Sequence, residues 1–174
     1  MENNNRFPLA MRLLHWAMAA LVISMLLAGL AMVRSLEPWQ LTILTAHKAF
    51  GLLAFVLVIL RIAIRVTSQT PPLPSSLSRV QKRGAIASHY VLYGLMVAMP
   101  VSGYLMQYVA ARPVEIFGLF TLPASLTADI ESYGLLREIH GYLAIAFIVM
   151  IVLHVSAALH HHFVRKDSVL KSML

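Results

Sequence analysis

Two kinds of residue are scarce in this chain of 174 residues, and each scarcity excludes something. Cysteine is absent, which rules out disulfides, thiolate metal sites and cysteine-ligated iron–sulfur clusters. Acidic residues number only seven against fourteen Lys and Arg, and charged residues make up 12% of the chain. Because an average soluble domain is about 25% charged, this composition is not that of a soluble domain. Any metal cofactor here is expected to be held by histidine.

Long apolar runs dominate what is present. Hydrophobic residues make up 59% of the chain, and the mean hydropathy is +0.76. Four stretches exceed the roughly 20 residues that cross about 30 Å of hydrocarbon; they lie near residues 9–33, 40–66, 84–109 and 135–163. The first is too long for the apolar core of a signal peptide. We therefore predict an all-α membrane protein, a bundle of four transmembrane helices with little chain left for a soluble domain.

The basic residues predict the orientation of the bundle. They gather at the N-terminus, in the 67–83 loop, at the C-terminus and at the adjoining helix ends, as Arg6, Arg12, Arg61, Arg65, Arg79, Lys82, Arg83, Arg165, Lys166 and Lys171. The two opposite loops and their helix ends carry slightly more acidic than basic charge. By the positive-inside rule both termini lie in the cytoplasm. The net charge of +7 is explained in this way and does not indicate a nucleic-acid partner.

Two of the connecting segments have recognisable compositions. The inner connection is rich in proline and serine, with Pro71, Pro72, Pro74, Ser75, Ser76 and Ser78, and is expected to be an extended surface linker. The outer connection, residues 110–134, contains enough Phe and Leu to fold back as a short cap. We expect that cap to shield the outer part of the bundle from water.

Histidines at helical spacing are the main functional signal. His140 and His154 lie fourteen residues apart in one apolar stretch. At about 100° and 1.5 Å per residue, both imidazoles leave the same face of one helix about 21 Å apart along its axis. Ionisable side chains inside a membrane are rare and usually functional. The spacing therefore predicts a site with two levels.

The depth of each histidine can be counted from the membrane face at which its helix begins. By this count, each of the two levels contains more than one histidine. His47 shares the outer level with His140, while His15, His89 and His154 share the inner level. A lone histidine in a helix is usually a core or interface residue, but pairs at matched depth on different helices favour metal binding. Two opposed neutral imidazoles from facing helices can hold a b-type haem. Four ligands at two depths would hold two haems.

Nearby arginines and glycines suit the same interpretation. Arg12 and Arg137 precede His15 and His140 by three residues, one turn nearer the water on the same face. Arg61 and Arg65 follow His47 by fourteen and eighteen residues, which places them at the inner level or just beyond it. All four are candidate partners for haem propionates, although Arg61 and Arg65 could equally extend to the lipid headgroups. Gly51 and Gly141, beside the outer histidines, would let a flat macrocycle approach the backbone or serve helix packing.

Other function classes receive less support from the residues. Carriers of ions or protons generally place carboxylates in their spans, and Glu138, near the outer end, is the only acidic residue in an apolar stretch. The run His160 to His162 is most simply an interfacial polar cluster. A metal-binding or transport protein using that run is the remaining alternative outside electron transfer.

The residues together resemble the prokaryotic cytochrome b561 family. The resemblance is carried by His15-Trp16 early in the first span, His47 with Gly51 in the second, and a Tyr-rich third span with Pro100 and Gly103. The last span, HGYLAIAFIVMIVLHVSAALHHHF, and the tail, HHHFVRKDSVLKSM, complete it. The resemblance covers nearly the whole chain and implies one integral-membrane cytochrome b domain over residues 1–174, located in the bacterial inner membrane.

The resemblance also implies cofactors, ligands and partners. It implies two non-covalent haem b groups, with His15 and His154 holding the inner haem and His47 and His140 the outer one. His89 is left over, as a contact to quinone or propionate or as a packing residue. Electrons would pass between a small periplasmic donor or redox protein, with superoxide as a family-level candidate, and membrane ubiquinone. His161, seven residues after His154, is the best quinone contact in its run.

Within electron transfer a second arrangement stays open. The chain could instead be a cytochrome b anchor subunit that passes electrons between quinone and a partner dehydrogenase or hydrogenase. For a free-standing oxidoreductase, the outer cations Lys48, Arg112 and Arg137 would draw a superoxide anion by electrostatic steering. The outer segments are slightly acidic overall, so any attraction is expected to be local.

Overall fold

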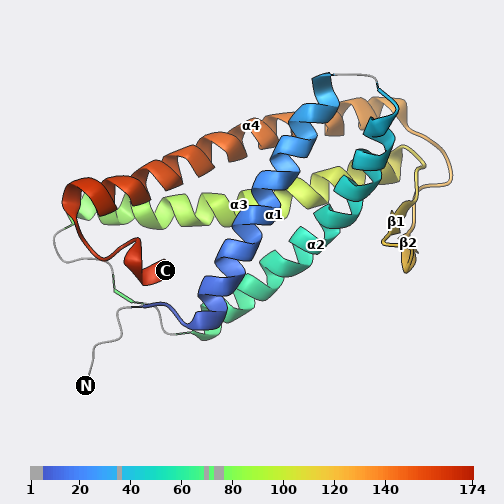
Figure 1. The fold of residues 1–174 in the computed structure, drawn as a ribbon. Helices are drawn as coiled ribbons and strands as arrows, with labels where there is room; N and C mark the ends of the chain where they lie inside the picture. The colour runs from blue at the N-terminus through green and yellow to red at the C-terminus, as the bar shows by residue number, and fades with distance from the viewer. Residues whose placement is uncertain (1–5, 35–36, 69–70, 73–76) are drawn as a thin grey trace.

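The computed structural model describes residues 6–34, 37–68, 71–72 and 77–174 and is dominated by four long helices. These are α1 (Leu9–Arg34), α2 (Trp39–Thr67), α3 (Arg79–Val109) and α4 (Ile130–His160) (Figure 1). All four are long and apolar enough to cross a membrane, which confirms the predicted number of spans. Of the predicted linker, residues 73–76 lie outside the described residues, including Pro74, Ser75 and Ser76.

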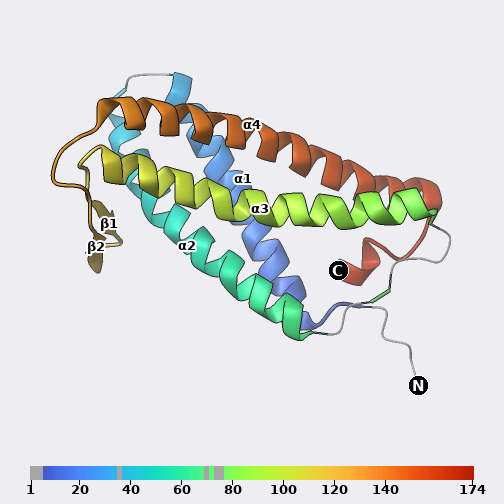
Figure 2. The ribbon, with the colours of Figure 1, turned by 180° about the vertical axis from the view of Figure 1, so that it is seen from behind.

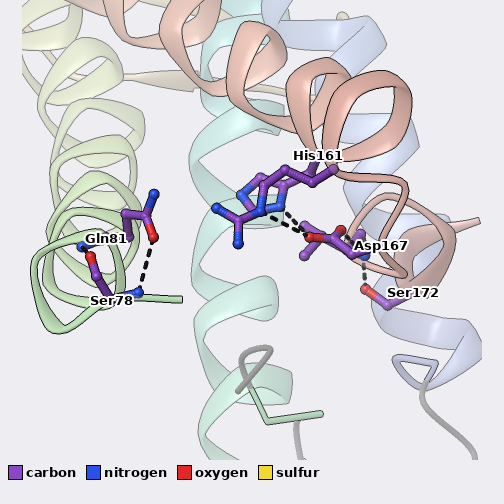
Figure 3. Close-up of polar contacts among 7 residues, drawn as sticks. Ser78, Gln81, His161, Asp167 and Ser172 are labelled. Atoms are coloured by element: carbon purple, nitrogen blue, oxygen red, sulfur yellow. Dashed lines mark hydrogen bonds and ion pairs between the residues drawn. The ribbon is translucent and has the colours of Figure 1, made fainter. Parts of the chain in front are cut away.

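Two helices begin five residues earlier than the hydropathy predicts, because polar side chains cap them. Ser78 accepts a hydrogen bond from the backbone N–H of Gln81, and the Gln81 side chain accepts one from the backbone N–H of Ser78, as Figure 3 shows. At α4, the Asp129 carboxylate accepts from the backbone N–H and the hydroxyl of Ser132. Such caps satisfy the free N–H groups of a first helical turn. Each helix can therefore start in the polar interfacial region.

The helices pack as two antiparallel pairs, and contacts between α2 and α3 join the two pairs. In both views α3 and α4 run side by side, and α1 and α2 form the second pair (Figures 1 and 2). α2 also packs against α3, whereas α4 makes few or no close backbone approaches to α1 and α2. An apolar cavity of about 170 Å³ lies between α1 and α4, lined by Ile23, Leu26, Leu27, Leu30, Ile148, Ile151 and Val152. Side chains therefore do not completely fill the space between α1 and α4.

The outer connection folds as a β-hairpin against the outer half of the bundle. Strand β1 (Val114–Ile116) pairs antiparallel with β2 (Phe120–Leu122), with Val114 opposite Leu122. Val114 and Ile116 are buried in one cluster with Ala49 of α2, and Tyr104 packs beside it. The hairpin is the cap expected from the sequence. It covers α2 two residues beyond His47.

Most apolar side chains face outward, as a bilayer requires. Leu13 is 62% exposed, Leu27 61% and Ile145 61%. In water such a surface would be an aggregation hazard, but lipid chains cover it at no hydrophobic cost. The few buried side chains include one charged group, Arg61, only 8% exposed. A buried guanidinium in a membrane-spanning helix indicates a functional site.

The C-terminal segment returns to the start of the chain. After α4 the helix widens into a π-helical turn, His161–Arg165, and Lys166 adopts a left-handed conformation with φ of 53°. The chain then reverses, and the backbone N–H of Phe7 donates to the Ser172 carbonyl at 2.9 Å. The Trp16 indole N–H donates to the Met173 carbonyl at 2.9 Å. This segment closes the end of the bundle opposite to the hairpin (Figure 1).

Candidate haem-binding sites

The inner level gathers three histidines from three helices. The ring centres of His15 (α1) and His154 (α4) lie 6.3 Å apart, and those of His89 (α3) and His154 lie 5.8 Å apart. Residues separated by up to 139 positions in sequence therefore meet at one depth. The prediction that His15, His89 and His154 share a level is confirmed. His154 is the member common to both close pairs.

Arg61 from α2 completes the inner cluster. Its Nη2 donates to Nδ1 of His15 at 3.0 Å, and its guanidinium lies 6.0 Å from the ring centre of Tyr93. Its Nη1 is buried and has no hydrogen-bond partner among the described residues. A buried, incompletely paired cation is costly unless an anion completes its contacts. This side chain therefore suits a carboxylate that enters from outside the protein.

The outer level contains His47 and His140. They lie on α2 and α4, and depth counting assigns both to this level. Nδ1 of His47 is buried without a partner among the described residues. Nδ1 of His140 instead lies 2.9 Å from the hydroxyl oxygen of Ser102 on α3. The two outer histidines thus have different polar surroundings.

Glycines on neighbouring helices approach the outer histidines closely. A Cβ at Gly29 of α1 would lie 3.8 Å from Cε1 of His47, and one at Gly103 of α3 would lie 3.2 Å from Cε1 of His140. At Gly51 and Gly141, which the sequence singled out, a Cβ would meet nothing within 4 Å. The residues that give each ring its room are therefore Gly29 and Gly103. Space remains open beside Gly51 and Gly141.

The other predicted arginines lie at different degrees of burial. Nε of Arg12 is buried without a partner among the described residues, close to the inner level. Arg65 is exposed, stacks over the Phe7 ring at 5.7 Å and remains within electrostatic range of His89. Arg137 is exposed near the outer end of α4. Arg61 and Arg12 are therefore better placed than Arg65 and Arg137 to meet a buried propionate.

The histidine run at the end of α4 divides into three environments. His160 is exposed, while Nδ1 of His162 is buried without a partner among the described residues. His161 donates from Nδ1 to the Asp167 carboxylate at 2.6 Å, as Figure 3 shows. In the described part of the chain no three His, Asp or Glu side chains converge as a group that could hold a bare metal ion.

The site fits a flat metal macrocycle with two acidic tails. Imidazole pairs could supply nitrogens to a metal, Gly29 and Gly103 leave room beside the outer rings, and the buried guanidinium of Arg61 has a nitrogen without a partner among the described residues. The ring centres of His15 and His154 lie 6.3 Å apart and those of His89 and His154 lie 5.8 Å apart, so either pair of imidazoles is close enough to hold one metal between them. The fold and the site together define a membrane cytochrome of the b type.

Comparison with known proteins gives the family. The family model described as prokaryotic cytochrome b561 matches residues 6–174. The chain is 36% identical over 163 residues to Cytochrome b561 homolog 2 of Escherichia coli K12, covering 92% of this chain and 86% of that protein. It is 34% identical over 165 residues to a Yersinia pestis protein named Probable superoxide oxidase CybB, covering 92% and 91%. This chain belongs to the prokaryotic cytochrome b561 family.

Family membership confirms the coarser expectations from the sequence. The protein is a multi-pass cytochrome of the bacterial inner membrane, it uses b-type haem, and its chemistry is oxidation and reduction. A third relative, Cytochrome b561 homolog 1 of Escherichia coli K12, is 25% identical over 177 residues and matches 98% of this chain and 97% of that protein. The family resemblance therefore extends from end to end.

Sequence reasoning missed Ser102, Gly29 and Gly103 as neighbours of the histidines. Gly103 stands out in the sequence only as part of the family pattern, and Ser102 has no helical-spacing relation to His140, which is 38 residues away. Depth counting of small and polar residues on α1 and α3 could have placed all three at the outer level. It could not have shown which of them faces a histidine.

Proposed function

We propose that this chain is a di-haem cytochrome that carries electrons across the inner membrane between a periplasmic donor and ubiquinone, with both termini in the cytoplasm. In this proposal His15 and His154 hold the inner haem, and His47 and His140 hold the outer one. Bound haem iron supplies one-electron redox chemistry. The protein supplies the haem ligands and the charge partners for the propionates. Its helices also hold the two haems inside the membrane, between the periplasmic and cytoplasmic faces.

One observation about packing carries the ligand assignment. Both proposed pairs bridge helices that make few or no close backbone approaches, α1 with α4 and α2 with α4. The competing pair, His89 with His154, bridges α3 and α4, which pack directly against each other along their length. A macrocycle cannot enter between two helices in direct contact. The packing therefore favours His15 over His89 as the partner of His154.

At the outer face the proposed donor is a small anion such as superoxide. Support comes from the name of the Yersinia pestis relative and from cations on the outer half of the bundle, including Lys48 and the exposed Arg137. Cations near the entry raise the local concentration of an anionic donor. Two superoxide anions would each lose one electron and leave as dioxygen.

At the inner face the proposed acceptor is a quinone beside His161. One quinone would take the two electrons released outside together with two protons, and so become a quinol. The Asp167 carboxylate accepts from Nδ1 of His161 at 2.6 Å, so that ring atom is engaged within the protein. Nε2 is then the ring atom that can pass a proton to a quinone oxygen. Water at the cytoplasmic face would return that proton to the ring.

The first test is a reduced-minus-oxidised visible spectrum with haem quantitation on the purified protein. We expect two haems per chain, and we expect His47→Ala and His140→Ala each to lose one haem while the inner haem stays. His15→Ala and His154→Ala should lose the other. His89→Ala is the matched control and should keep both. Protein without haem, or loss of the inner haem from His89→Ala but not from His15→Ala, would show the assignment to be wrong.

The second test concerns the donor and acceptor. Reduction of a soluble ubiquinone analogue should proceed when superoxide is generated beside the purified protein, and His161→Phe should slow it while leaving both haems in place. If a stoichiometric dehydrogenase or hydrogenase co-purifies and is needed for quinone reduction, the anchor-subunit alternative replaces the free-standing oxidoreductase.

A further inference from the structure

The hydroxyl of Ser102 forms two hydrogen bonds that together fix the chemistry of the His140 ring. Ser102 is 6% exposed, and its hydroxyl donates to the Met99 carbonyl one turn earlier on α3, at 2.9 Å. The same oxygen lies 2.9 Å from Nδ1 of His140. A serine hydroxyl has one proton. Because that proton is used towards Met99, the oxygen faces His140 as an acceptor.

The acceptor role of Ser102 determines which ring nitrogen of His140 has the proton. The polar group beside Nδ1 is thus an acceptor, so Nδ1 is protonated and Nε2 has the free lone pair. A neutral imidazole in that tautomer can bind a metal through Nε2 without first losing a proton. Gly103 allows this position of the ring, because a Cβ added there would lie only 3.2 Å from Cε1 of His140.

The partner ligand at the same level has no such contact. Nδ1 of His47 is buried and unpartnered among the described residues. A hydrogen bond from the distal N–H of a metal-bound histidine makes the ring a stronger electron donor and stabilises the oxidised metal. Any such influence on the outer haem therefore comes from the His140 side.

We propose that Ser102 is a positioning residue that fixes the tautomer and orientation of His140 and lowers the midpoint potential of the outer haem. This rests on the proposed function, because it takes His140 as a ligand of that haem. A lower outer potential makes the outward-facing haem the better electron donor to the inner one. Ser102 thereby favours electron flow towards the cytoplasmic side.

The test is a redox titration of purified protein followed by visible absorption, without any turnover. The outer component is identified as the one missing from His140→Ala. We expect Ser102→Ala to keep both haems and to raise the potential of the outer component alone, whereas Ser102→Thr, which restores a hydroxyl, returns it towards the wild-type value. Loss of the outer haem from Ser102→Ala but not from Ser102→Thr supports the same role.

A matched control lies on the same helix. Ser88 donates to the Ala85 carbonyl at 2.9 Å with the same spacing of three residues, but at the inner end of α3. Ser88→Ala should leave the outer potential unchanged. The proposal is overturned if Ser102→Ala leaves both potentials unchanged, or if Ser88→Ala moves the outer potential equally. These outcomes differ from failure of the proposed function, in which wild-type protein lacks two haems or His140→Ala keeps both.

Discussion

At the scale of single residues, burial separates groups that helical spacing alone treats alike. Arg61 and Arg65 lie one turn apart on α2, and both are predicted as propionate partners. Arg61 is 8% exposed and donates to His15, whereas Arg65 is exposed and stacks on Phe7. A charge has a larger effect on a buried redox centre than one screened by water or headgroups. The two side chains should therefore differ in function.

We predict that Arg61→Leu lowers the midpoint potential of the inner haem. A positive charge stabilises the reduced state, and one unit charge at about 8 Å and an effective dielectric of about 20 contributes about 2 kcal/mol. Arg65→Leu is the matched control and should shift the potential much less. Redox titration of both variants checks the prediction. Equal shifts would show that burial does not decide the role of these arginines.

At the scale of elements, a short polar contact determines how the chain ends. Burial opposes ionisation of Asp167, but hydrogen bonds from His161 and from the Val169 backbone N–H, with the charge of Arg165 nearby, lower its pKa below the ordinary value of 3.8. The left-handed Lys166 lets the chain reverse between these partners. The returning segment then bonds to Phe7 and Trp16 on the other side of the bundle end.

We predict that Asp167→Asn loosens residues 168–174 from the bundle by about 1.5 to 3 kcal/mol, the contribution of a hydrogen bond to a charged group. Since the folded pKa is depressed, this stabilisation is complete above pH 3.8 and is lost as the pH falls through the folded value. Hydrogen exchange at Ser172 and the emission of Trp16 in a Trp39→Phe background would report the loosening. Ser168→Ala is the control. An unchanged exchange rate in Asp167→Asn would contradict the prediction.

At the scale of the whole molecule, four spans place both ends of the chain on one side and the hairpin on the other. The basic residues assign the side with the chain ends to the cytoplasm. In the structure, the C-terminal segment and the beginning of α1 lie at the same end of the bundle (Figures 1 and 2). The assignment of each end of the bundle to the cytoplasmic or periplasmic face is a prediction, because it depends on how the chain inserts into the membrane.

The cysteine-free chain is a ready background for testing this orientation. We predict that Thr121→Cys in the exposed hairpin reacts with a membrane-impermeant maleimide in intact spheroplasts. Ser168→Cys in the C-terminal segment should react only after the membrane is opened. The reverse pattern would show that the termini face the periplasm. Retention of haem in both variants serves as the control for folding.

The sequence by itself determined how many helices cross the membrane and at what depth each histidine lies. Depth follows from the fixed rise of a helix, so the inner level of His15, His89 and His154 could be read without a fold. Tertiary structure decided which side chains meet at each level, because the rotation and pairing of helices depend on packing between distant segments. It brought Ser102 to His140, buried Arg61 beside His15, and packed α3 directly against α4, the two helices that hold His89 and His154.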